Sequence, residues 1–211
     1  MASTARSPAV NKRRLILDAA VRVFARQGFH TCRVSDIADE AGVAYGLVYH
    51  YFDSKDEVLD VLFLERWNVL LDAISEIDGR EIAAREKLYG IASFIVDSYR
   101  HDPELMKVII VEVTRAANSF GQTHLAKIRE AYTKIGAIVS AAQAAGEFRT
   151  EVAPEFATMA FYGAIEQVLT GWIFGLLAED DHHYDEAKAF VVEVICTGLD
   201  APGSRAAGPS D

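Results

Sequence analysis

Apolar residues recur three and four positions apart along nearly the whole chain, which is the period of an α-helix. No stretch alternates apolar and polar residues convincingly enough to predict a β-strand. Start and stop signals divide the pattern into about nine helices. The expected helices span residues 8–27, 34–41, 45–52, 55–77, 81–101, 103–118, 121–145, 154–177 and 184–198. The sequence therefore predicts an all-α fold.

Two of these helices are short and are separated by Gly42, which is the pattern of a helix-turn-helix. Together with the preceding helix they predict an N-terminal three-helix domain over residues 1–55. Ser54 and Glu57 form a capping box that opens the long fourth helix, the start of a second helical domain over residues 56–200. Residues 201–211 are rich in Gly, Pro, Ser and Ala, and we expect a disordered tail.

Charge is distributed unevenly along the chain, whose formal net charge is -10. Residues 1–34 hold seven basic residues and one acidic residue, whereas residues 61–211 hold 13 basic and 23 acidic residues. A basic head on an acidic body is expected where one end of a protein meets a polyanion. A solvated N-terminal helix face would give the same composition, so charge alone leaves both interpretations open.

The stretch "GVAYGLVYHYF", residues 42–52, crowds aromatic side chains onto a short helix. Val43, Val48 and Phe52 have the spacing to face the first helix, which leaves Tyr45 and Tyr49 toward the outside. Phenol and imidazole groups donate hydrogen bonds from stiff rings and suit contact with DNA phosphates. A three-helix packing module with aromatic rim contacts is the alternative that this stretch leaves open.

The wider string "GFHTCRVSDIADEAGVAYGLVYHYFDSKDEVL", residues 28–59, resembles the TetR family of bacterial transcriptional repressors. That resemblance implies a homodimer that binds operator DNA through the N-terminal domain, and a C-terminal domain that dimerises and binds a small ligand. Cys32 and Ala44 depart from the common pattern, because many members carry a hydroxyl residue there that contacts phosphate. The remaining candidates for DNA contact are Arg33, Ser35, Tyr45, Gly46, Tyr49, His50 and Lys55.

The expected helix over 154–177 is apolar nearly all round, so it must be buried on more than one side. Gly163, Gly171 and Gly175 share one ridge that permits close approach of another helix. With Phe190 and Val194 of the last helix, this ridge predicts a self-complementary dimer interface. A neighbouring polar ridge of Tyr162, Glu166 and Thr170 could line a pocket or lie satisfied in the core.

The segments "AIEQVLTGWIF" and "GVAYG" resemble the FadR-like branch of the family, which controls fatty-acid degradation and responds to long-chain acyl-CoA. Such an effector needs a long apolar slot with cations at its mouth. Candidate effector-binding residues are Phe94, Met106, Ile110, Val113, Arg115, Phe120, Tyr132 and Trp172. The same aromatic residues could equally be core, and the effector could be a steroid, a drug or another aromatic ligand.

An enzyme is the main competing class of function, for example a helical acyl-CoA-processing enzyme. No GxSxG, P-loop, GxGxxG after a strand, or HExxH motif occurs, so we expect neither an enzyme nor a cofactor. His182 and His183 lie among aspartates, where a solvated acidic loop is expected more than a metal site. Two cysteines without CxxC spacing and the lack of a long apolar run predict a cytoplasmic protein that contacts no membrane. A ligand-free architectural protein would share these features.

Overall fold

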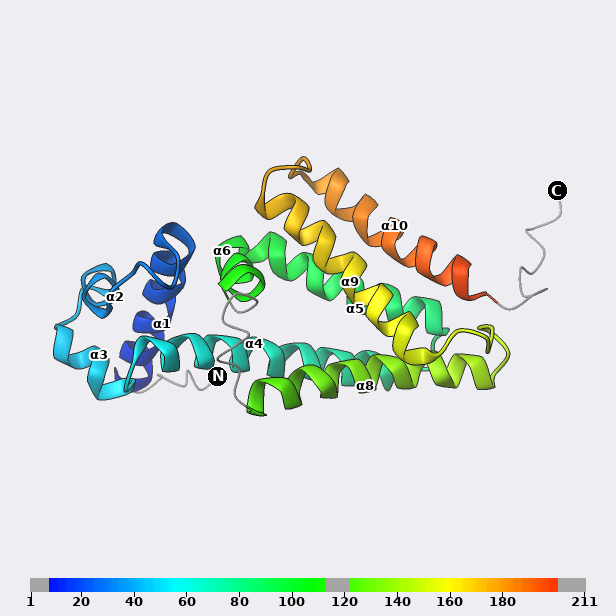
Figure 1. Ribbon diagram of the computed structural model, residues 1–211, viewed down its shortest axis with the longest axis horizontal. Coiled ribbons are helices and arrows are strands. Elements are labelled where there is room, and N and C mark those ends of the chain that lie inside the picture. The colour runs from blue at the N-terminus through cyan, green and yellow to red at the C-terminus, as the bar shows by residue number, and fades with distance from the viewer. Residues whose placement is uncertain (1–7, 113–121, 201–211) are drawn as a thin grey trace, which may run out of the picture. The chain divides into compact units, whose positions relative to one another are not determined.

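The computed structural model describes residues 8–112 and 122–200, and within these ranges it contains helices and no β-strand (Figure 1). This confirms the all-α prediction. A π-helical segment, η1 (Val108–Glu112), follows α6, and an isolated antiparallel bridge joins Phe148 to Asp200. The α-helices are α1 (Pro8–Gln27), α2 (Val34–Ala41), α3 (Tyr45–Tyr51), α4 (Lys55–Asp78), α5 (Ala84–His101), α6 (Pro103–Lys107), α8 (Gln122–Ala144), α9 (Pro154–Ile173) and α10 (Asp181–Leu199).

The chain divides into two compact units. Unit 1 combines Met1–Arg66 with Asp102–Phe120, and unit 2 combines Trp67–His101 with Gly121–Asp211. Helix α4 therefore begins in unit 1 and ends in unit 2. The functional boundary at residue 55 stays a prediction, and the expected tail at 201–211 lies outside the described residues.

Unit 1 has a core formed where α1 packs on α2 and α2 packs on α3. The buried side chains follow the helical period along α1, and they include Ile16, Ala20 and Phe24. Val48 from α3 and Phe52 after it are also buried, as predicted, and so is Ile37 from α2. The short helices thus bury one face each and leave the other outside.

Unit 2 packs α5, α8, α9 and α10 against one another. Trp172 is 2% exposed, and its ring lies 5.5 Å from that of Tyr99 and 4.8 Å from that of Tyr184. The buried Lys188 of α10 pairs with Asp97 of α5 at 2.6 Å, so its charge is compensated inside this packing. Aromatic stacking and this ion pair fix α10 to α5.

Helix α9 ends at Ile173, earlier than the predicted end at residue 177. Gly175 adopts a left-handed conformation with φ 66°, and the backbone N–H of Leu176 donates to the carbonyl of Gly171 at 2.7 Å. The chain then folds back, so that a Cβ added at Gly171 would lie 2.7 Å from Leu177 Cδ1. Gly175 is therefore not on the helix, and the close contact at Gly171 lies within the chain.

Three other predicted boundaries were wrong. Helix α5 begins at Ala84 rather than at residue 81, and α10 begins at Asp181 because Asp180 accepts a hydrogen bond from the His183 backbone N–H at 3.0 Å. The expected α-helix from residue 103 gives way to the π-helical turn after Lys107, and its predicted end at 118 lies outside the described residues. Among the residues described, no helix is long and apolar enough to cross a membrane.

Candidate nucleic-acid interface and effector pocket

The turn between α2 and α3 is tight because Gly42 adopts a left-handed conformation with φ 64°. Its N–H donates to the carbonyl of Asp39 at 3.1 Å, and the N–H of Val43 donates to that of Ala38 at 3.0 Å. The buried Ile37 and Val48 hold the two helices in the core of unit 1. Figure 1 shows α2 and α3 as two short helices joined by this turn.

The outward side of α3 carries two neighbouring tyrosines. Tyr45 is 54% exposed and Tyr49 is 45% exposed, with ring centroids 5.2 Å apart. Their hydroxyl oxygens lie 3.2 Å apart in a hydrogen bond, which raises the pKa of Tyr49. A phenolic hydroxyl can both donate and accept a hydrogen bond. The helix thus presents a pair of stiff hydrogen-bonding groups to the outside.

The other predicted contact residues lie near this pair in sequence. Gly46 and His50 are exposed on α3, and a Cβ added at Gly46 would meet no atom within 4 Å. Arg33 is exposed at the start of α2, where its backbone N–H donates to Asp36 at 2.8 Å, and Ser35 is half-buried in the first turn. The contact roles of these residues stay predictions.

Arginines of the basic head are largely ion-paired. Arg22 and Arg26 of α1 bind Glu40 of α2 at 2.7 and 3.1 Å, and these contacts lower the pKa of Glu40. Arg13 and Arg14 reach Glu65 of α4 at 3.1 and 3.4 Å. Part of the positive charge of the N-terminal region is therefore used in ion pairs that join α1 to α2 and α4.

Lys55, at the start of α4, points its ammonium group at the loop between α1 and α2. Its Nζ donates to the carbonyl oxygens of Phe29 at 2.7 Å, Cys32 at 3.0 Å and His30 at 3.4 Å. The same nitrogen lies 4.6 Å from the centre of the Phe29 ring. These contacts were not predictable from the sequence, because they depend on how the loop folds over α4.

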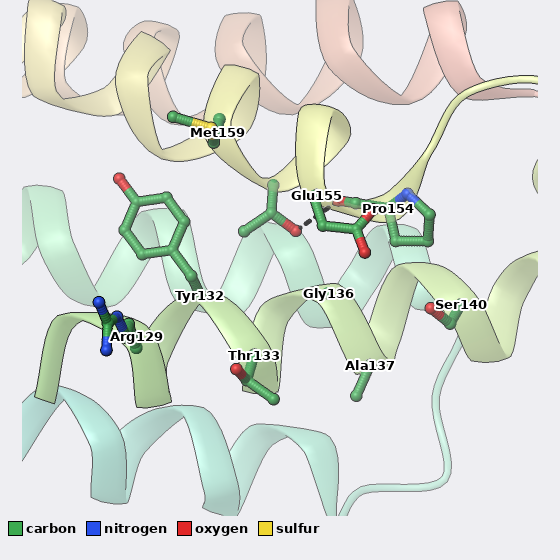
Figure 2. Close-up of a pocket in the computed structure, with 10 residues that line it drawn as sticks. Arg129, Tyr132, Thr133, Gly136, Ala137, Ser140, Pro154, Glu155 and Met159 are labelled. Carbon is green, nitrogen blue, oxygen red and sulfur yellow. Dashed lines mark hydrogen bonds between the residues drawn. The ribbon is translucent and has the colours of Figure 1, made fainter. Parts of the chain in front are cut away.

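Unit 2 contains a pocket of about 690 Å³ between α8 and α9 (Figure 2). Thr158 at its wall donates a hydrogen bond to the carbonyl oxygen of Pro154 at 2.8 Å, which Figure 2 marks with a dashed line. Arg129 and Tyr132 lie toward one end, while Ser140 lies toward the other. The lining residues are Arg129, Tyr132, Thr133, Gly136, Ala137, Ser140, Pro154, Glu155, Thr158 and Met159.

Tyr132 connects this pocket to an aromatic cluster within unit 2. Its ring lies 5.4 Å from that of Tyr162, which in turn stacks on Trp67 at 6.1 Å. Burial raises the pKa of Glu166, which lies one helical turn from Tyr162. The pKa of Tyr132 is also raised, mainly by burial of its side chain and secondly by the charge of Glu166. Tyr162 and Glu166 of the polar ridge are thus half-buried, with Tyr162 beside the rings of Trp67 and Tyr132.

The predicted effector residues occupy different surroundings. Tyr132 lines the pocket. Trp172 is instead buried in the core, where its indole N–H donates to the carbonyl oxygen of Ala178 at 3.1 Å. Phe94 is half-buried on α5. Met106 is buried on α6 and Ile110 half-buried in η1, both in unit 1. Val113, Arg115 and Phe120 lie outside the described residues.

The sequence analysis missed the other pocket residues, although α8 carried a signal for them. Arg129, Thr133, Ala137 and Ser140 recur three and four positions apart on one face, and all four are exposed. Small and polar residues on such a face leave room for a groove beside the next helix. Which residues of α9 complete the groove depends on the packing of the two helices.

Exposed apolar side chains gather on α9 and α10. Phe156 and Met159 on α9 are 72% and 59% exposed, and Phe190 and Val194 on α10 are 61% and 53% exposed. The two helices pack against each other within unit 2. Side chains this large and this exposed on adjacent helices are typical of a surface that another protein covers.

The histidines at 182 and 183 show no metal-binding arrangement. His183 Nδ1 lies 2.8 Å from Asp180, and hydrogen bonds from the His183 backbone and side chain lower the pKa of Asp180. No group of three or more His, Cys, Asp or Glu side chains that could hold a metal occurs among the residues placed by the structure.

Comparison with protein families finds matches over most of the chain. Residues 16–62 match the family described as bacterial regulatory proteins, tetR family, and residues 63–194 match the family described as YsiA-like protein, C-terminal region. The sequence is 29% identical over 187 residues to the fatty acid metabolism regulator protein of Bacillus subtilis, covering 87% of this chain and 93% of that protein.

Solved structures of fatty acid regulators are also similar to this chain. The fatty acid degradation regulator FadR from Bacillus halodurans superimposes with a TM-score of 0.78 at 26% identity, covering 94% of this chain and all of that one. FadR from B. subtilis in complex with stearoyl-CoA superimposes with a TM-score of 0.75 at 26% identity, covering 88% of this chain and 98% of that one.

Proposed function

Because this chain belongs to the TetR family of bacterial regulatory proteins, we propose that it is a ligand-responsive transcriptional repressor. It binds a near-palindromic operator as a homodimer in the cytoplasm, and a small apolar effector releases it. The family and the matched relative are regulators rather than enzymes. The observation that carries the proposal is the helix-turn-helix, whose α3 exposes Tyr45 and Tyr49 beside each other.

DNA contact is proposed for the outer side of α3 and the start of α2. Tyr49 and His50 donate to phosphates, while Tyr45 also reaches base edges and Gly46 allows the backbone to approach the groove. Arg33 and Ser35 extend this surface from α2. In the DNA-bound dimer, the two copies of α3 lie roughly one helical turn apart, ~34 Å, as two half-sites require.

Dimerisation is proposed through the exposed apolar faces of α9 and α10. Phe190 and Val194 of one copy meet the same surface of the other, which gives a self-complementary four-helix interface. Gly163 has no atom within 4 Å of an added Cβ, so a partner helix can approach there. Gly171 does not serve this purpose, because Leu177 of the same chain already covers it.

A long-chain acyl-CoA is the proposed effector. The similar B. subtilis structure was solved with stearoyl-CoA, and the pocket between α8 and α9 offers apolar walls with Arg129 at one end. A cation there suits the phosphates of the CoA group. A steroid or other aromatic ligand is the second candidate, because the rings of Trp67, Tyr162 and Tyr132 form a cluster that suits stacking.

Release follows a population shift between a DNA-competent and a DNA-incompetent state. The effector must bind the incompetent state more tightly, or it changes nothing. A preference of roughly 100-fold corresponds to ~2.7 kcal/mol of coupling. Helix α4 runs from unit 2 into unit 1, so a displacement of α4 on effector binding carries α2 and α3 out of register with the groove.

Two experiments test the proposal. Selection of bound sequences from random duplex DNA is expected to return one near-palindromic motif, and a random collection would contradict the repressor function. A thermal-shift screen against acyl-CoAs, free fatty acids, steroids and aromatic drugs is expected to raise the melting temperature with long-chain acyl-CoA. If only a steroid or an aromatic drug does so, the acyl-CoA assignment is wrong.

A further inference from the structure

We propose that Lys55 is a positioning residue, which fastens the α1–α2 loop to the start of α4 and makes no phosphate contact. Residues 29–33 of this loop lead directly into α2, whose N-terminal cap is Arg33. The inference rests on the proposed function in one respect, namely that α2 and α3 bind operator DNA.

The hydrogen bonds of Lys55 account for all of its donors. An ammonium group has three N–H bonds and no acceptor. The carbonyl oxygens of Phe29, His30 and Cys32 lie 2.7, 3.4 and 3.0 Å from Nζ, so each donor has a partner within the chain. A phosphate could take one of these donors only if a carbonyl lost its bond.

The surroundings of the α1–α2 loop stabilise the ammonium group of Lys55. It follows the C-terminus of α1, and the partial negative charge at a helix C-terminus favours a nearby cation. Phe29 is buried with its ring 5.4 Å from Phe24, so the wall under the ammonium group is anchored in the core. The Phe29 ring also faces Nζ at 4.6 Å, which adds a cation–π contact.

Lys55 thus connects the start of α4 to the loop that precedes α2. Its backbone lies at the first residue of α4, and its side chain ends on the residues immediately before α2. A displacement of the start of α4 therefore moves the start of α2 with it. This makes Lys55 a link through which a movement of α4 reaches α2, in addition to the short backbone connection between α3 and α4.

The test compares Lys55→Met with Lys55→Arg, with Lys12→Met as the control for loss of a positive charge at an exposed site of unit 1. Amide hydrogen exchange of residues 29–33 is measured without DNA. Operator affinity is measured as a function of salt. For a positioning residue, Lys55→Met is expected to speed exchange of this loop several-fold and to weaken the operator complex about tenfold. Lys12→Met is expected to leave the exchange unchanged.

The salt dependence separates positioning from phosphate contact. Each phosphate contact contributes ~0.9 to the slope of log affinity against log salt concentration, so the slope of Lys55→Met is expected to equal that of the wild type. Lys55→Arg is expected not to restore affinity, because a planar guanidinium does not match three converging carbonyls. A slope reduced by ~0.9, with affinity restored by arginine, would overturn the proposal.

The result of the amide hydrogen exchange measurement does not depend on the proposed function. If no operator is found, faster exchange of residues 29–33 in Lys55→Met still supports the link between the loop and α4, and unchanged exchange overturns it. Lys55→Arg keeps the charge and the aliphatic stem. It therefore serves as the variant for the exchange measurement if Lys55→Met does not fold, with the same two outcomes.

Discussion

Tyr45 and Tyr49 form a pair of neighbouring phenols on the outer side of α3. The sequence places them four positions apart on a short helix, and the structure shows both exposed with their hydroxyl oxygens 3.2 Å apart. Neighbouring phenols in this arrangement orient each other before DNA arrives, so less freedom is lost on binding. Their contributions to operator affinity should therefore depend on each other.

A double-mutant cycle tests this dependence. Tyr45→Phe and Tyr49→Phe are each expected to weaken operator binding about tenfold, because each removes a hydroxyl contact. The double variant is expected to bind the operator less than tenfold more weakly than Tyr49→Phe does. The reason is that Tyr49→Phe alone already removes the hydrogen bond between the two hydroxyl groups. Tyr89→Phe, at an exposed tyrosine of unit 2, is the control and should change nothing. Strictly additive losses would contradict the coupling.

Two glycines of the same motif should respond in opposite ways. Gly42 is left-handed with φ 64°, so Gly42→Ala is expected to lower the free energy of unfolding by roughly 1–2 kcal/mol. Gly46 lies within α3 with open space around it, so Gly46→Ala is expected to raise stability by about 0.5–1 kcal/mol. Thermal or denaturant unfolding measures both changes.

Gly46→Ala is also tested by its affinity for operator DNA. Gly46→Ala is expected to weaken DNA binding despite its gain in stability, because the added methyl group lies where the backbone approaches the groove. A variant that is both more stable and fully active in DNA binding would show that α3 does not approach DNA at Gly46.

At the scale of helices, much of the fold was predictable from the sequence because local signals set most boundaries. Gly28 and Gly42 ended α1 and α2 as expected, and the Ser54 hydroxyl accepts from the Glu57 backbone N–H at 3.1 Å. The end of α9 was not predictable in the same way. Its apolar residues continue to Leu177, whereas the left-handed Gly175 and the packing of Leu177 over Gly171 show that the chain has turned back.

The candidate site was predictable to a similar extent. The residues of the outer side of α3 followed from helical spacing, whereas the partners of the basic residues did not. Arg22 and Arg26 bind Glu40, and Lys55 binds the carbonyls of a loop more than 20 residues earlier in the chain. Such pairs are set by how helices and loops meet, and that information lies outside any single segment.

The pairing of Glu40 with Arg22 and Arg26 should make the attachment of α2 to α1 pH-dependent. Its pKa is lowered by the two arginines, so the pair stabilises the fold above the unfolded-state value and loses this effect as the pH falls through the lowered value. Glu40→Gln is therefore expected to lower the melting temperature at pH ~7 and to lower it by less at pH ~3, which is below the ordinary glutamate pKa of ~4.3.

Salt and a matched variant serve as controls for Glu40. The side chains of Arg22 and Arg26 are 44% and 57% exposed, so the difference should shrink in high salt. Glu76→Gln removes an exposed pair between the last turn of α4 and Arg80, which follows the helix, and should have a smaller effect. An equal loss of stability at both pH values would show that Glu40 acts through packing rather than charge.

For the whole molecule, the exposed apolar face of α9 and α10 predicts a dimer without effector. Sedimentation at micromolar concentration is expected to show the dimer, and Phe190→Glu is expected to give a monomer, because an unpaired carboxylate would be buried at the interface. Val69→Glu, at a half-exposed position on α4, is the control and should remain dimeric. A wild-type monomer would rule out this interface.

The central claim is that an apolar effector controls the affinity for DNA. The most direct test titrates the operator complex with acyl-CoAs of increasing chain length, using free CoA as the control. Long chains are expected to weaken operator binding about 100-fold, which corresponds to ~2.7 kcal/mol of coupling, and short chains or free CoA should have little effect. Release by a steroid or aromatic compound alone would keep the repressor and discard the acyl-CoA. Operator affinity that no acyl-CoA, fatty acid, steroid or aromatic compound changes would contradict the claim.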